Sequence, residues 1–245
     1  MINYKMIVQY EGTKYQGWQR QESTGNTLQG KFEAILSRMC DTKVEIQASG
    51  RTDAGVHAFG QVANFHINTE KTPQEIMDYL NQYLPEDVAV IAIEIVSERF
   101  HSRLNAKRKT YRYRVLNSAI PHIFDRRYVY QVETALDVDR MQEAASYLLG
   151  THDFKAFTST KKSKKSTVRT LETIRIEQVL DEIQFTYVGN GFLYHMVRIL
   201  TGTLLEVGMG EKSAADILTI MESGLREKAG ALVPAKGLTL LEVEY

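Results

Sequence analysis

Only one cysteine, Cys40, occurs in the 245-residue sequence, which excludes an internal disulfide bond and a cysteine-rich zinc site. No apolar run approaches the roughly 18 residues of a membrane-spanning helix, and the first residues alternate like a strand rather than a signal peptide. We therefore expect a cytoplasmic protein. The hydrophobic fraction of 43% is ordinary for a globular chain and is enough for one or two packed units.

Motifs that hold metals and nucleotides are missing as well. The six histidines show no HExxH pattern or comparable ligand spacing. The stretch "GNG", residues 189–191, lacks the Lys-Ser/Thr pair of a P-loop and the spacing of a dinucleotide fingerprint. The sequence therefore predicts neither a metal site nor a bound nucleotide cofactor.

Positive and negative charges balance, at 30 Lys and Arg against 30 Asp and Glu, but they are unevenly spread. Residues 99–127 contain nine basic residues against Asp125, and residues 155–175 contain seven against Glu172. Two basic blocks predict a surface that binds a polyanion, because neutralised phosphates release counterions. For "KKSKK", residues 161–165, a solvated charged loop is an equally good interpretation, and we expect its surroundings to be mobile.

The N-terminal half, residues 1–104, is expected to run strand, helix, strand, strand, helix, strand. Thr27 is a candidate N-cap for a helix with one apolar stripe, and a second helix follows Pro73. This order resembles a split βαβ, ferredoxin-like unit. Strand-like patterns cover residues 4–10, 43–48, 61–67 and 88–96.

The C-terminal half, residues 105–245, is expected to repeat this plan, although the two halves share no visible sequence identity. Runs of strands separated by helices, without regular crossovers, predict an α+β fold with a mainly antiparallel sheet. The patterns place strands at 108–117, 167–180, 182–189 and 237–245, and helices at 138–148, 192–208 and 214–222.

A lone carboxylate, Asp53, lies in "SGRTDAGVHAFGQV", where a polar, glycine-containing segment leads into a strand. Asp-Ala-Gly is good turn chemistry, because the Asp side chain can bond the nearby backbone and Gly tolerates positive φ. A structural turn is therefore one interpretation of these residues. A functional carboxylate is the second, since the segment is long, runs directly into a strand and belongs to a chain with two basic blocks.

The segment resembles the signature of the pseudouridine synthases of the tRNA pseudouridine synthase A (TruA) family. Further stretches agree with that family in order and spacing over nearly the whole chain, so the resemblance is specific. They are "YEGTKYQGWQRQ", "TLQGKFEAIL", "FHSRLNAKRKTYRY", "GTHDFKAF", "GNGFLYHMVRILTGTLLEVG" and "GLTLLEVEY". The resemblance implies the pseudouridine synthase fold, with both halves in one continuous sheet, helices on one face and a central RNA-binding cleft.

The same resemblance assigns roles to four residues. Asp53 is the family's catalytic aspartate, which acts while the uridine N1–C1′ bond is broken, through either a C1′ adduct or a glycal-like intermediate. Tyr111 corresponds to the residue that stacks on the uracil and moves the C5 proton, although packing between strands also accounts for a tyrosine there. Arg198, a cation on an apolar helix, corresponds to the aspartate's basic partner. Arg51 is a candidate for holding phosphates or filling the gap left by the extruded base.

The family's substrates are uridines 38 to 40 of the tRNA anticodon stem-loop, and its members act as homodimers. A base within a stem must be flipped out, while the RNA backbone is held by cations. Two alternative functions stay open: a non-catalytic RNA-binding protein with RRM-like halves, and a glycosidase or nucleosidase, which would need a second carboxyl group. The expected RNA-binding residues are Arg108, Lys109, Arg112, Lys161, Lys162, Lys164 and Lys165.

Overall fold

The computed structural model describes residues 1–160 and 165–245, and the chain divides into two compact units. The first unit comprises Met1–Lys107 and Thr239–Tyr245, and the second comprises Arg108–Leu238. The first boundary lies close to the expected division after residue 104. The final strand is grouped with the first unit, where it pairs with a strand of the N-terminal half.

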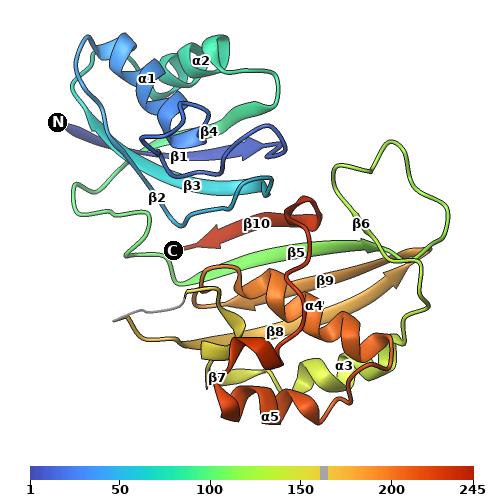
Figure 1. Ribbon diagram of the computed structural model, residues 1–245. Coiled ribbons are helices and arrows are strands. Elements are labelled where there is room, and N and C mark those ends of the chain that lie inside the picture. The colour runs from blue at the N-terminus through green and yellow to red at the C-terminus, as the bar shows by residue number, and fades with distance from the viewer. Residues whose placement is uncertain (161–164) are drawn as a thin grey trace. The chain divides into compact units, whose positions relative to one another are not determined.

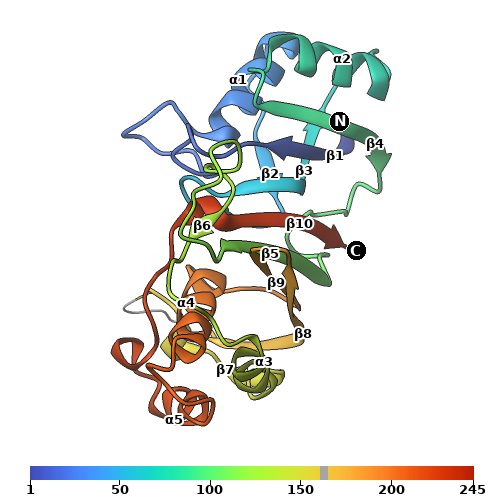
Figure 2. The ribbon, with the colours of Figure 1, turned by 90° about the vertical axis from the view of Figure 1, so that its right-hand side faces the viewer.

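The first unit is a sheet with two helices that lie side by side (Figures 1 and 2). The strand order is β4-β1-β3, with antiparallel pairing. One end of β3 pairs with β2 and the other with β10, which runs parallel to it. This is the predicted split βαβ arrangement. The elements are β1 (Ile2–Tyr10), α1 (Leu28–Cys40), β2 (Ile46–Ala48), β3 (His57–Ile67), α2 (Pro73–Tyr83), β4 (Val88–Val96) and β10 (Leu238–Glu244).

Local signals explain where both helices of the first unit begin. The predicted cap of α1 is confirmed, because the Thr27 side chain accepts a hydrogen bond from the Gly30 amide. At α2, Thr72 and Glu75 form a capping box, and Pro73 occupies the first turn, where its missing N–H costs nothing. The caps fix where the two helices begin. In the sheet, the alternate β1 residues Tyr4, Met6, Val8 and Tyr10 are buried.

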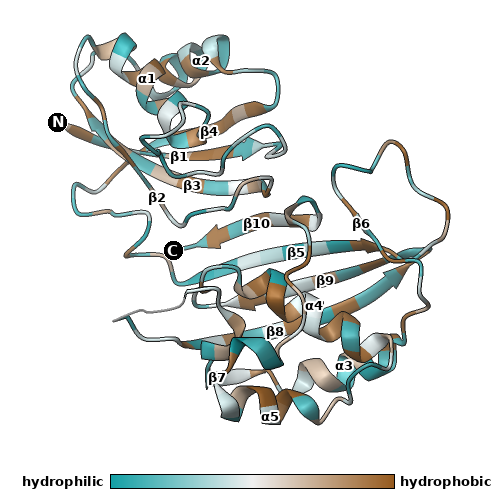
Figure 3. Cartoon of the chain, viewed as in Figure 1, coloured by the Kyte–Doolittle hydropathy of each residue, from teal (hydrophilic) through white to brown (hydrophobic). Residues whose placement is uncertain are grey.

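The second unit has an antiparallel sheet in the order β5-β9-β8-β7, with short β6 parallel to β5. Helices α3 and α4 pack on each other, α3 contacts β8 and α4 contacts β5 (Figure 1). Hydrophobic and neutral residues run along most of α4, as a buried helix requires (Figure 3). The elements are β5 (Arg108–Leu116), β6 (Tyr130–Gln131), α3 (Val138–Ser146), β7 (Gly150–Asp153), β8 (Val168–Val179), β9 (Glu182–Gly189), α4 (Met196–Gly208) and α5 (Asp216–Ser223).

The fold class is therefore α+β with mainly antiparallel strands, as predicted. Helix α4 begins at Met196 rather than at residue 192, because His195 has a left-handed φ of 65° that a continuous helix cannot contain. The two short strands β6 and β7 were not predicted. No helix within residues 1–160 and 165–245 has both the length and the apolar character needed to cross a membrane.

Candidate active site

Asp53 lies in a tight turn that connects β2 to β3. The Val56 amide donates a hydrogen bond to the Asp53 carbonyl at 3.2 Å, and Gly55 between them has a φ of 80°. Glycine adopts this conformation without strain, as the sequence predicted for Asp-Ala-Gly. Asp53 is half-buried and Arg51, two residues earlier, is exposed. Turn chemistry and a candidate catalytic carboxylate thus occur in the same four residues.

The first sequence motif, "YEGTKYQGW", packs directly on the backbone of this turn. A Cβ atom on Gly12 would lie 2.0 Å from the Val56 carbonyl oxygen. A Cβ atom on Gly17, whose φ is 85°, would lie 2.7 Å from the Thr52 carbonyl oxygen. Only glycine allows such close approach, so the two glycines let one loop support the other.

Hydrogen bonds fix the same segment from two sides. The Trp18 amide donates to the Thr52 carbonyl at 3.0 Å, and the Thr52 hydroxyl lies 2.8 Å from the buried hydroxyl of Tyr10. Upstream, the fully buried Gln61 accepts from the Ser49 hydroxyl at 2.7 Å and donates to the Gly50 carbonyl at 3.0 Å. The Asp53 backbone is therefore held in one place, which is what a preorganised catalytic group requires.

Gly17→Ala is expected to lower the single-turnover rate of the reaction in which Asp53 takes part by about 10²-fold. The added methyl group would push the Asp53 turn away from its working position by a fraction of an ångström. It should also lower the free energy of unfolding by about 1–3 kcal/mol, since alanine is strained at positive φ. Gly25→Ala is the control, because nothing lies within 4 Å of a Cβ atom there. A normal rate for Gly17→Ala would contradict the positioning role of this loop.

Tyr111 occupies the middle of β5 in the second unit. It lies opposite Tyr187 of β9, and its ring meets the edge of Phe192 with 5.0 Å between ring centroids and an interplanar angle of 78°. Its side chain is 8% exposed. Such an edge-to-face pair fixes both rings in place.

Arg198 lies in the first turn of α4 and is half-buried. Its Nε donates to the Val233 carbonyl at 2.8 Å, and the Tyr113 hydroxyl donates to the adjacent Pro234 carbonyl at 2.7 Å. Burial raises the pKa of Tyr113, and the positive charge of Arg198 acts in the opposite direction. The segment 233–234 therefore joins α4 to β5 and orients the guanidinium.

Close packing explains why this segment lies along α4. A Cβ atom on Gly202 would lie 1.9 Å from the Ala231 carbonyl oxygen, and one on Gly230 would lie 2.6 Å from the Thr203 backbone. The Thr203 hydroxyl also accepts a hydrogen bond from the Gly230 amide at 2.8 Å. The glycine in "RILTGTLLEVG" thus serves to bring the chain near residue 231 against the helix.

Ion pairs neutralise part of the first basic block. Arg108 is 2.7 Å from Glu172 of β8, and Arg114 pairs with Glu182 of β9 and lies 3.5 Å from Asp125. Glu172 on β8 and Glu182 on β9 lie outside residues 99–127, so a count of charges within that window overstates the local positive charge. Of the expected RNA-binding residues, Arg108 is therefore already engaged with a carboxylate.

The remaining expected RNA-binding residues are placed differently. Lys109 and Arg112 lie on β5, where strand alternation puts Arg112 on the opposite face from Tyr111. The buried Nε of Arg112 has no hydrogen-bond partner among the described residues. Lys165 is exposed, at the end of its loop. Lys161, Lys162 and Lys164 lie outside the described residues.

Sequence reasoning missed three neighbouring residues of "GNGFLYHMVR". Phe192 contacts Tyr111. Tyr194 is 55% exposed and stacks on His195 with 3.7 Å between centroids, and His195 Nδ1 lies 2.8 Å from the Ser159 hydroxyl. The run of aromatics before the helix was the available signal. In the part of the chain that the structure describes, no group of three or more His, Cys, Asp or Glu could hold a metal ion.

Comparisons with known proteins identify the family. A family model described as tRNA pseudouridine synthase matches residues 6–105 and 144–245. The tRNA pseudouridine synthase A of Bacillus sp. (strain KSM-64) is 47% identical, and the tRNA pseudouridine synthase A 1 of Clostridium tetani is 44% identical, each over 100% of both chains. A chain in the crystal structure of a Cbf5-Nop10-Gar1 complex aligns over 82% of this chain and 45% of that chain, at 12% identity and a TM-score of 0.37, which is too low to establish a shared fold. The family model and the full-length relatives show that this chain belongs to the tRNA pseudouridine synthase family and is an isomerase.

Proposed function

We propose that this protein converts uridine to pseudouridine in the anticodon stem-loop of tRNAs, at positions 38 to 40, with Asp53 as the catalytic residue. Relatives named tRNA pseudouridine synthase A support tRNA as the substrate. The observation that carries the proposal is the anchored Asp53 turn, whose residues match the family signature. The stem-loop positions rest on the resemblance to the family.

The reaction is an isomerisation whose atoms balance without a co-substrate. The N1–C1′ bond breaks with assistance from the Asp53 carboxylate, the uracil rotates, and a C5–C1′ bond forms. The C5 proton is lost and N1 gains a proton, so no net oxidation or reduction occurs. A single carboxylate suffices for this sequence, whereas a retaining glycosidase needs a second carboxyl group as acid.

Tyr111 and Arg198 complete the proposed catalytic group. Tyr111 would stack on the uracil and move the C5 proton, and the edge contact with Phe192 would fix its ring for that purpose. Arg198 would act as the cationic partner of Asp53 and hold its carboxylate toward the sugar. The bond to Val233 supports this role, because it sets the plane of the guanidinium before substrate binds.

The target base must leave the stem to reach Asp53, and the flipped base is then held between aromatic or apolar groups. The surrounding RNA would be held through its phosphates by basic residues of the two blocks, with Lys109, Arg112 and Lys165 as candidates among the described residues. We further propose that the protein acts in the cytoplasm as a homodimer, as its family does.

The test is release of tritium from tRNA transcribed with [5-³H]uridine. We expect release without added cofactor, and none from a tRNA in which uridines 38 to 40 are replaced with compensating changes in the stem. Release from the replaced tRNA would contradict the proposed positions. Tight binding of the original tRNA without release would instead favour a non-catalytic RNA-binding protein.

A further inference from the structure

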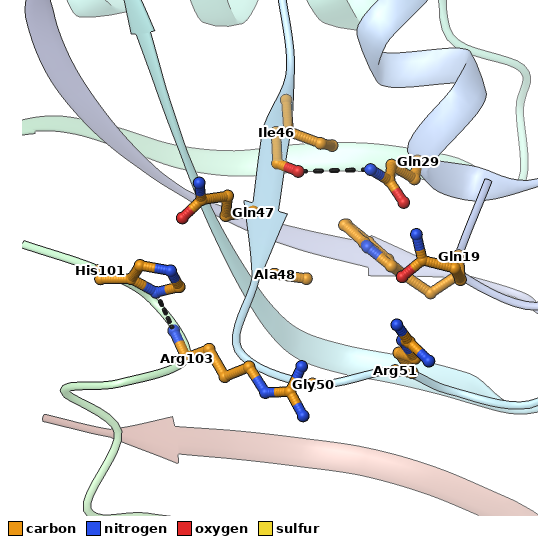
Figure 4. Close-up of a pocket in the computed structure, with 10 residues that line it drawn as sticks. Gln19, Gln29, Ile46, Gln47, Ala48, Gly50, Arg51, His101 and Arg103 are labelled. Carbon is orange, nitrogen blue, oxygen red and sulfur yellow. Dashed lines mark hydrogen bonds between the residues drawn. The ribbon is translucent and has the colours of Figure 1, made fainter.

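A polar pocket of about 250 Å³ lies in the first unit, beside the Asp53 turn. Its walls are formed by the segment before α1, by α1, by β2 and the segment that follows it, and by the segment after β4 (Figure 4). Gln47, Arg51, His101 and Arg103 are among the lining residues. None of its ten lining residues is acidic. A pocket bounded by two arginines and no carboxylate favours an anionic occupant.

His101 adds a hydrogen-bond donor to this pocket. Its Nδ1 accepts from the Arg103 amide at 3.1 Å (Figure 4) and from the Leu104 amide at 3.4 Å. A neutral imidazole carries one proton, so acceptance at Nδ1 places that proton on Nε2. The ring therefore has an Nε2–H to donate in its neutral form.

The two arginines differ from further cations of the first unit. Arg20 pairs with Glu33 at 2.9 Å, and Lys5 pairs with Glu94 at 2.8 Å. Arg51 and Arg103 are both exposed, and within residues 1–160 and 165–245 their guanidinium groups make no hydrogen bond or ion pair. Both guanidinium groups are thus available to a ligand.

The segment that carries His101 and Arg103 is held firmly. The Ser102 hydroxyl donates to the Gln47 carbonyl at 2.6 Å, and the Ser102 amide donates to Asn64 at 2.9 Å. The Tyr245 hydroxyl donates to the Ser102 carbonyl at 2.7 Å. Binding would therefore order only the arginine side chains, which keeps the entropic cost small.

We propose that this pocket binds a backbone phosphate of the RNA strand, held by Arg51, Arg103 and His101, close to the target uridine. A nucleobase fits less well, because Trp18 is the only aromatic indole or phenyl ring in the wall and it is 2% exposed, so it offers no face for stacking. Arg51 is two residues from Asp53, which places the phosphate near the reacting nucleotide. The inference rests on the proposed function, since it takes tRNA as the ligand.

A methylphosphonate scan tests the proposal. One phosphate at a time around the target uridine of a synthetic anticodon stem-loop is made neutral, and the dissociation constant is measured for wild type and Arg103→Gln. We expect one neutral position to weaken wild-type binding about tenfold, and Arg103→Gln to weaken binding of the unmodified RNA by a similar factor. Neutralising the same phosphate should not weaken binding by Arg103→Gln any further.

Arg99→Gln is the matched control, because Arg99 is exposed, lies in the same segment and does not line the pocket. In Arg99→Gln, neutralising the sensitive phosphate should still weaken binding about tenfold, as in wild type. If neutralising that phosphate weakened binding by Arg103→Gln as much as it weakens binding by wild type, the phosphate assignment would be overturned. It would also be overturned if affinity fell on removal of a base and not on neutralisation of a phosphate. Wild-type protein that binds this RNA but releases no tritium would refute the proposed function separately.

Discussion

Asp53→Asn is expected to lower the single-turnover rate of pseudouridine formation by on the order of 10⁴-fold or more, while tRNA affinity stays within about threefold of wild type. The amide keeps the size of the carboxylate but cannot act as an anion at the sugar. Affinity should persist because RNA is held through phosphates by cations, to which a carboxylate contributes nothing favourable. Rapid-quench assays of single turnover, with binding measured by filter retention, would separate the two quantities.

The control for this experiment is Asp41→Asn. Asp41 is exposed and ends α1 with a φ of 50°, a conformation that asparagine also tolerates. The Asp41→Asn substitution removes the same charge from the same unit and should leave the single-turnover rate unchanged. A rate within about tenfold of wild type for Asp53→Asn would exclude Asp53 as the catalytic residue, and a parallel loss of affinity would make it a binding residue instead.

Signals that act over a few residues were predictable from the sequence. The Thr27 cap, the helix after Pro73 and the Gly55 turn each depend on neighbours within about one turn of chain, and all three occur in the structure. The order of strands and helices in the first unit also followed from periodicity. The resemblance to a family, rather than these patterns, selected Asp53 as catalytic.

Contacts between distant residues were not predictable in the same way. Strand β6 has two residues, too few to show a period, and β7 has four, none of which is a buried apolar residue. The pair formed by Arg114 and Glu182 joins residues 68 apart in the chain, so a count of charges in a window cannot include it. The polar pocket likewise combines β2 with residues 101–103, which only the folded unit brings together.

The two basic blocks therefore need to be judged residue by residue. A cation paired with a carboxylate on another strand of the same sheet, as Arg108 is with Glu172, contributes less to binding RNA than its charge suggests. Arg51 and Arg103 have no such partner in the described part of the chain. Local neutralisation, rather than the number of basic residues, decides which cations can hold phosphate.

Arg198→Met is expected to lower the single-turnover rate by about 10²- to 10⁴-fold if Arg198 holds the catalytic carboxylate in place. Methionine keeps much of the apolar stem but removes both the charge and the hydrogen-bonding fork. Arg198→Lys should recover part of the rate, because it restores the charge without the planar geometry that the bond to Val233 orients. The measurement is the single-turnover rate of the three proteins on the same tRNA at saturating enzyme.

Arg226→Met provides the matched control for loss of structure. Arg226 also donates to main-chain carbonyls of the segment beside α4, at 3.2 Å to Ala229 and 2.9 Å to Gly230, and it is not in the proposed catalytic group. Both Met variants should lose similar thermal stability, because each removes a guanidinium bonded to this segment. Only Arg198→Met should have a lower single-turnover rate. If the two variants instead lose rate in proportion to stability, or if Lys at 198 recovers stability without rate, then Arg198 supports the fold and does not act on the catalytic carboxylate.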